Sequence, residues 1–194
     1  GRFVGDNALA AVGACYSLTN VFISIAIGGG VGASVLTSRF FGSREYQKMK
    51  MSVSTALLSF LAVSLTLGCV GLLSGREIMI LLNTPDNILP QATEYLNIYF
   101  LGLPFLFMYN VLASMFNALG RSRIPLYLLI FSSVFNIVLD LILVCRLHMG
   151  VAGVAWATLI AQGISAVLAF FLFLKEMRNY PTDGKMTLFS GGEF

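Results

Sequence analysis

Charged side chains are scarce in this sequence of 194 residues: only 11% are Asp, Glu, Lys or Arg, while 57% are hydrophobic. A soluble domain carries roughly 25% charged residues, and the mean hydropathy here is +0.85. So little polar surface cannot cover a water-soluble globule of this size. The composition excludes a disordered chain and a nucleic-acid-binding domain, so no nucleic-acid partner is expected. Membrane lipid is expected to surround much of the chain.

Cysteine and histidine are also rare, and neither is arranged for chemistry. Cys15, Cys69 and Cys145 lie in apolar stretches at no metal-ligand or redox spacing, and the single histidine, His148, stands alone in a connection. The pattern excludes a disulfide scaffold. No Ser/His/Asp, Cys/His or paired-acid arrangement supports catalysis, so the sequence predicts neither an enzyme nor a cofactor.

Long apolar runs dominate instead, and five of them reach the length of about 20 residues that a helix needs to cross a bilayer. They cover about 8–38, 51–73, 88–119, 126–145 and 151–174. The runs are continuous rather than alternating, which disfavours a barrel. The sequence therefore predicts an all-α integral membrane protein with five transmembrane helices over residues 1–178. Residues 179–194 are expected to form a cytoplasmic linker or a truncated end.

Lys and Arg residues divide unevenly between the two ends of these spans, which predicts the orientation. The connections after the first, third and fifth spans carry nine of these residues: Arg39, Arg44, Lys48, Lys50, Arg121, Arg123, Lys175, Arg178 and Lys185. The other side of the membrane carries three, which are Arg2, Arg76 and Arg146. The first side is expected to be cytoplasmic, with the N-terminus outside. Since the chain shows neither an initiator Met nor a leader, we expect it to be a piece of a longer protein.

The first and third spans exceed the minimum length and contain residues that can bend a helix. Such bends would act as hinges. For the glycines, close helix packing is the favoured explanation, and the two roles are compatible. A mid-helix proline removes one backbone hydrogen bond. The candidate hinge residues are Gly28, Gly29, Gly30 and Gly32 in the first span and Gly102 and Pro104 in the third.

One acidic residue, Asp140, lies well inside an apolar span. An unpaired carboxylate at mid-membrane costs at least about 2.5–3.5 kcal/mol. Neutralising an ordinary Asp at pH 7 costs about 4 kcal/mol, which is comparable. Asp140 is thus poised between protonated, cation-paired and water-solvated forms, as an ion-coupling site requires.

Further polar residues fall at helical spacing around Asp140 and elsewhere. Asn136 is four residues before Asp140 and shares its helix face, while Thr158 and Gln162 are likewise four apart on the next span. Asn136, Asp140 and Thr158 sit at similar depths on antiparallel neighbours, so we expect them to converge on one intramembrane pocket. Such pairs can also simply hold helices together. Asn110, on the third span, is a candidate cavity-lining residue for which that structural role is favoured.

Three stretches together resemble a known family. They are ALAAVG at 8–13 with TSRFFG at 37–42, YNVL at 109–112 with LGRSRIP at 119–125, and NIVLD at 136–140 with GVAGVAWAT at 150–158. In this combination and order, which covers nearly the whole chain, the sequence resembles the multidrug and toxic compound extrusion (MATE) family of cation-coupled antiporters.

The resemblance implies a twelve-helix transporter of two six-helix lobes, of which this chain is similar to spans two to six of the N-terminal lobe. Its partners would be the missing first helix and the C-terminal lobe of the parent chain. In bacterial and archaeal members an Asn and an Asp on span five and a Thr on span six contribute to a proton or sodium site. These roles transfer to Asn136, Asp140 and Thr158. The Asp that the family carries on span one has no counterpart in this chain.

The resemblance implies a multi-pass protein of the cell membrane that exchanges H⁺ or Na⁺ for amphipathic, often cationic, drugs or toxic compounds. No cofactor is implied, and no metal beyond Na⁺ at Asp140. A lipid-linked saccharide flippase of the same superfamily is an alternative, disfavoured because no Lys or Arg lies centrally in the five spans. A structural or receptor-type helical bundle is another, but it leaves Asp140 unexplained.

Overall fold

Five long helices make up the computed structural model, which describes residues 6–181. They are α1 (Asp6–Gly42), α2 (Tyr46–Leu81), α3 (Leu89–Ala118), α4 (Arg123–Asp140) and α5 (Gly150–Met177), with a short π-helix, η1 (Leu141–Arg146), continuing α4. Counting α4 and η1 as one segment, all five are long and apolar enough to span a membrane. Of the segment 179–194, residues 182–194 lie outside the described part.

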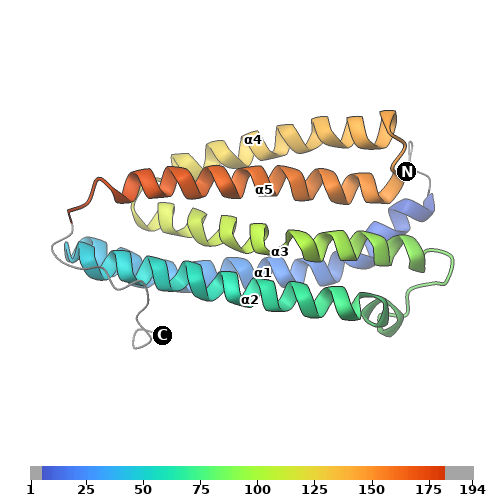
Figure 1. Cartoon of the computed structure of the whole chain (residues 1–194), viewed down its shortest axis with the longest axis horizontal. Helices are drawn as coiled ribbons and strands as arrows, with labels where there is room; N and C mark the ends of the chain where they lie inside the picture. The colour runs from blue at the N-terminus through green and yellow to red at the C-terminus, as the bar shows by residue number, and fades with distance from the viewer. Residues whose placement is uncertain (1–5, 182–194) are drawn as a thin grey trace.

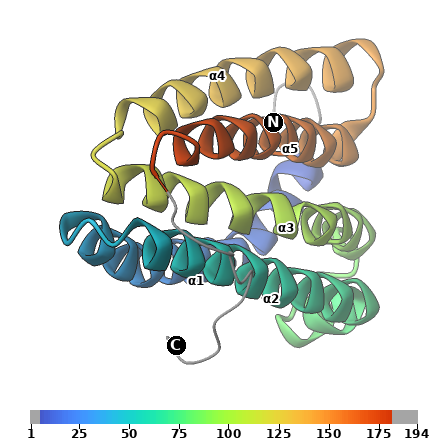
Figure 2. The same ribbon diagram turned by 60° about the vertical axis from the view of Figure 1, so that its left-hand side comes forward.

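The third helix is the centre of the bundle. It packs against α1, α2 and α5, while α4 packs chiefly on α5 at the edge. Figures 1 and 2 show this order, from α4 through α5 and α3 to the α1–α2 pair. Half of the residues in the most apolar stretch of α3 are buried, whereas only 6% of those in the most apolar stretch of the α4–η1 segment are buried. The helix that carries Asp140 is therefore the least enclosed.

The α3 helix stops in a way that its sequence explains. Gly120 has a left-handed φ of 72°, which glycine adopts without the penalty that a Cβ would bring. Its N–H donates to the Asn117 carbonyl, and the next N–H, of Arg121, donates to the Phe116 carbonyl. This pair of bonds is the Schellman motif, which satisfies carbonyls at a helix end.

The helix α4 ends earlier than its apolar run predicts. The run predicts one helix to about residue 145, but regular α-helix stops at Asp140 and the π-helix follows. A π-helix has a wider turn than an α-helix and is frequent at functional sites. It comes close to α5, because a Cβ on Gly153 would lie 3.3 Å from the backbone carbon of Leu143. Gly153 thus permits the tight turn between the two elements.

Glycines on α2 let it approach α3 closely. Gly68, Gly71 and Gly75 are buried at one helix face, and a Cβ on Gly71 would overlap the ring of Phe100. Phe100 itself is 1% exposed. Small residues at membrane helix interfaces allow this backbone approach.

The four glycines in α1 divide into two pairs. A Cβ on Gly29 would strike the Phe60 ring and one on Gly30 would lie 2.8 Å from Ser114 Oγ, whereas Gly28 and Gly32 have nothing within 4 Å. Packing therefore accounts for Gly29 and Gly30 but not for Gly28 and Gly32. The α1 helix continues through all four, and α3 continues through Gly102 and Pro104. Hinge motion at these residues stays a prediction.

The end of α5 is tied to the turns around it. Arg121 Nε and the Tyr180 hydroxyl both donate to Glu176 Oε1, at 3.1 and 3.0 Å. Lys50 Nζ donates to the Tyr180 carbonyl at 2.7 Å, and the Tyr180 ring lies 5.3 Å from that of Tyr46. These contacts fix the chain leaving α5 against α2 and the α3–α4 turn.

Candidate functional site

Asn136 of α4 and Thr158 of α5 meet across the interface of their helices. The Asn136 amide donates to Thr158 Oγ1 at 3.4 Å. The Thr158 hydroxyl in turn donates to the Val154 carbonyl one turn earlier, at 3.0 Å. With its own hydrogen directed to Val154, the hydroxyl oxygen accepts from Asn136, which leaves the Asn136 amide oxygen as an acceptor. The predicted meeting of these two residues is present in the structure.

Asp140 lies one helical turn from Asn136, at the junction of α4 and η1. Its Oδ1 is buried and has no hydrogen-bond partner among the described residues. Neither Asn136 nor Thr158 forms a hydrogen bond with it in this part of the chain. A buried carboxylate oxygen without a donor is costly, and such a group calls for a proton or a cation.

Tyr95 of α3 belongs to the same neighbourhood, because it lines a small cavity together with Thr158 of α5. Sequence reasoning does not find this tyrosine, because the face of α3 that meets α5 is not a local property of the sequence, and a tyrosine is ordinary at the end of a membrane span. It packs with Ile98 and Ala155 in a small cluster between α3 and α5. A third helix thus contributes a hydroxyl-bearing side chain to the cavity that Thr158 lines.

A small cavity between α3 and α5 adjoins these residues. Thr158 and Gln162 line it from α5, and Tyr95, Tyr99 and Gly102 line it from α3. Gln162 is among the residues that line this hollow, and its role in a transport cavity stays a prediction. Thr158 belongs both to this cavity and to the Asn136–Thr158 pair.

Asn110 does not belong to this group. Its amide donates to the Leu106 carbonyl of its own helix at 2.8 Å, and its backbone carbonyl faces Gly30 of α1. Its place is the α1–α3 interface, where the bond back to α3 satisfies the amide.

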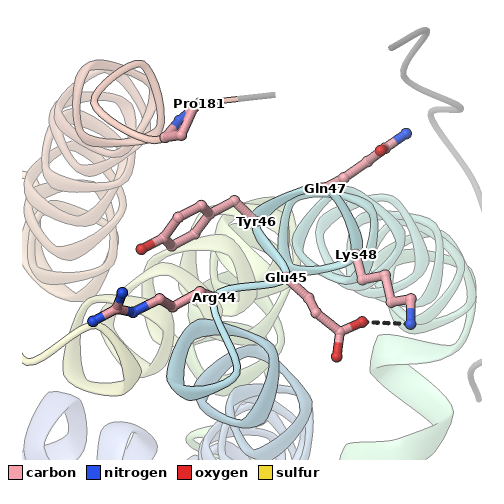
Figure 3. Close-up of a pocket in the computed structure, with 6 residues that line it drawn as sticks. All are labelled: Arg44, Glu45, Tyr46, Gln47, Lys48 and Pro181. Atoms are coloured by element: carbon pink, nitrogen blue, oxygen red, sulfur yellow. Dashed lines mark ion pairs between the residues drawn. The ribbon is translucent and has the colours of Figure 1, made fainter. Parts of the chain in front are cut away.

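A larger hollow opens at the opposite end of the molecule, at the α1–α2 turn. Arg44, Glu45, Tyr46, Lys48 and Pro181 line it (Figure 3). Glu45 and Lys48 form an ion pair there. This hollow lies at the surface and contains none of the predicted site residues.

The group around Asp140 offers a carboxylate, an amide oxygen and hydroxyls, all of them hard oxygen ligands. Oxygen donors of this kind suit hard cations and can equally hold a protonated acid. Within the described residues, no cluster of three His, Cys, Asp or Glu side chains could hold a metal. The arrangement has no nucleophile paired with a base.

Comparison with known proteins decides the family, because the MatE family model matches residues 1–142. The chain belongs to the MatE family. Its members are transporters rather than enzymes, and the five spanning helices make this chain part of an integral, multi-pass membrane protein.

Among curated relatives, the MatE chain is 31% identical over 192 residues to the probable multidrug resistance protein YoeA of Bacillus subtilis (strain 168), covering 97% of this chain and 41% of that protein. It is 30% identical over 147 residues to the multidrug export protein MepA of Staphylococcus aureus (strain MRSA252), covering 76% and 33%. The chain thus spans about two-fifths or less of the length of these relatives.

Solved structures agree with this assignment. An inward-facing multidrug resistance MATE transporter of the MOP superfamily superposes with a TM-score of 0.89 at 26% identity, covering 98% of this chain and 43% of that one. A MATE protein in complex with MaL6 superposes with a TM-score of 0.88 at 26% identity, covering 100% of this chain and 43% of that one. The five-helix arrangement is therefore that of part of a twelve-helix MATE transporter.

Proposed function

We propose that the protein containing this chain is a cation-coupled antiporter of the cell membrane, which exports amphipathic, often cationic, compounds in exchange for H⁺ or Na⁺. Asp140 carries the coupling ion, with Asn136 and Thr158 beside it. The observation that supports this most is the buried Asp140 oxygen with no partner among the described residues, one turn from an ordered Asn136–Thr158 hydrogen bond. The names of the relatives YoeA and MepA support the drug-export part.

Coupling requires that the lobe can pack in two ways and that ion and exported compound each change the relative stability of these two packings. Binding of a proton or cation neutralises Asp140 and removes the cost of its charge in a low-dielectric site. A neutral or paired Asp140 then favours one packing of α4 against α5, and the exported compound favours the other. A ligand shifts such an equilibrium only by its difference in affinity for the two states.

The test uses the full-length transporter in sealed proteoliposomes, with a fluorescent amphipathic cation such as ethidium as the reporter. An outward-directed gradient of either H⁺ or Na⁺, with the ion more concentrated in the lumen, is imposed separately, and ethidium uptake into the lumen of inverted vesicles is followed. We expect Asp140→Asn to abolish gradient-driven uptake while downhill ethidium exchange persists. Asp86→Asn, which neutralises an exposed acid in the α2–α3 connection, is the matched control and keeps wild-type uptake.

Gradient-driven uptake that survives in Asp140→Asn would contradict the proposal and favour a structural role for this residue. The gradient that drives the wild-type protein identifies the coupling ion. A flippase of the same superfamily would instead move a phosphate-bearing lipid, and transport of such a lipid in place of ethidium would favour that alternative.

A further inference from the structure

A groove runs between α2 and α5 at the end of the bundle that the Lys and Arg distribution assigns to the cytoplasm. Both helices pack on α3 but scarcely on each other, so a hollow of about 240 Å³ remains between them. Its apolar walls are Val53 and Leu57 of α2 and Phe173 and Leu174 of α5. We call it the α2–α5 groove.

The polar groups of the α2–α5 groove gather at one end. Lys50 and Ser54 from the start of α2 and Arg178 from just beyond α5 line it there, and none of the described lining residues is acidic. The Tyr180 carbonyl accepts a hydrogen bond from Lys50 Nζ at 2.7 Å, which holds the ammonium at the rim. The rim therefore combines two cations with a hydroxyl.

Depth along the helices separates this polar end from the apolar walls. Leu57 is seven residues beyond Lys50, about 10 Å deeper at 1.5 Å per residue, and Leu174 is one turn deeper than Arg178. Since α2 begins and α5 ends on the same side, the lining of both helices changes from polar to apolar in the same direction. The Phe173 wall is supported from α3, whose Phe116 ring meets the Phe173 ring edge to face at 5.1 Å.

We propose that the α2–α5 groove binds an anionic phospholipid of the cytoplasmic leaflet. Lys50, Arg178 and Ser54 contact the headgroup phosphate, and an acyl chain lies along Val53, Leu57 and Leu174. Charge complementarity and the parallel polar-to-apolar gradients select this occupant, because a phospholipid has the same sequence of an anionic head and an apolar tail. The proposal is independent of the coupling chemistry at Asp140.

A single tryptophan in the groove tests it through quenching by brominated lipids. All native tryptophans of the full-length transporter, including Trp156, are first replaced by substitutions such as Trp156→Phe. Leu174→Trp then supplies the groove tryptophan. It is reconstituted in vesicles of phosphatidylcholine with either brominated phosphatidylglycerol or brominated phosphatidylcholine. A second protein carries Leu172→Trp instead, at an exposed position on the opposite face of α5. This reference tryptophan reports on lipid at a similar depth outside the groove.

We expect the groove tryptophan to be quenched more strongly by the anionic lipid, with a preference of roughly fivefold for each cation, about 1 kcal/mol apiece. Lys50→Gln with Arg178→Gln should reduce this preference to that of the reference tryptophan. Lys175→Gln, which removes an exposed cation outside the groove, should leave it unchanged.

Three results would overturn the proposal. An equal preference at the groove and reference tryptophans would show only a general attraction of anionic lipid to a basic surface. A preference unaffected by Lys50→Gln with Arg178→Gln would remove the assigned headgroup site. A groove tryptophan that neither lipid quenches would show that another part of the transporter covers the groove.

Discussion

The backbone carbonyl oxygen of Phe100 in α3 lies 3.0 Å from the place that a Cβ would take on Gly68 of α2. In a regular helix this carbonyl accepts the N–H of the residue four positions later, which here is Pro104 and has no N–H. The Phe100 carbonyl therefore has no helical N–H donor, and it faces Gly68 of the neighbouring helix. The two helices therefore approach each other most closely by backbone at the turn of α3 that precedes its proline.

Gly68→Ala should destabilise the protein, because the new methyl group pushes against the Phe100 carbonyl and α2 must move away. Overpacking of this kind costs about 1–3 kcal/mol, visible as a lower thermal unfolding temperature in detergent. Gly28→Ala is the control, since nothing lies within 4 Å of its added Cβ, and there a better helix propensity should leave stability equal or higher. Equal losses from both substitutions would contradict the packing argument.

Pro104→Ala should stabilise α3 and slow transport. The alanine supplies the N–H that the Phe100 carbonyl lacks, so α3 becomes a more regular helix. Thermal unfolding should rise or stay constant while the transport rate in proteoliposomes falls. A variant with an unchanged transport rate would show that Pro104 is not part of a hinge.

Asn136 and Thr158 should be energetically coupled. In a double-mutant cycle of Asn136→Ala and Thr158→Val, we expect an interaction free energy of about 0.6 kcal/mol, typical of hydrogen bonds between membrane helices. Unfolding in mixed micelles measures it. Ser133→Ala, at an exposed position on α4, replaces Asn136→Ala in a control cycle and should show no coupling with Thr158→Val.

Tyr180 should titrate above its usual value. Burial raises the pKa of Tyr180 from 10.0, and its hydrogen bond to Glu176 raises it further. Its contribution to stability is therefore complete below pH 10 and is lost as the pH rises through the folded-state pKa. Ultraviolet titration should show a lower midpoint in Glu176→Gln than in the wild type, whereas Glu77→Gln, in the far half of α2, should have no effect.

Glu45 should titrate below its usual value. Its hydrogen bond with Lys48 lowers the pKa of Glu45 from 4.5, with a smaller contribution from Ser43. The stabilising contribution is present above pH 4.5 and is lost as the pH falls through the folded-state pKa. An NMR titration of labelled glutamate should show the midpoint of Glu45 move upward in Lys48→Gln. An unchanged midpoint would contradict the pairing in Figure 3.

The number of spans and the Asn136–Thr158 contact follow from the sequence, because apolar length and a helical spacing of four are local properties. The short connection between α4 and α5 makes neighbours of the helices that carry them. The position of Tyr95 beside Thr158 could not be predicted, since it depends on which face of α3 packs against α5. The π-helix after Asp140 was equally hidden, because Leu141–Arg146 is as apolar as an ordinary helix.

The second helix also extends well beyond its predicted bounds, from Tyr46 to Leu81 rather than from 51 to 73. Hydropathy locates the part of a helix that lipid favours, and not the turns that continue it into the polar interface. Of the four glycines in α1, sequence could not separate Gly29 and Gly30, which packing requires, from Gly28 and Gly32. That distinction depends on Phe60 and Ser114, which come from other helices.

The peripheral position of α4 has a consequence for how the protein assembles in the membrane. Inserted helices associate after each has formed, and α3 offers the largest surface for α1, α2 and α5 to gather around. The segment α4–η1 adds to this four-helix nucleus through little more than α5. Among the five described helices it should therefore be the last to join and the first to exchange its amide hydrogens.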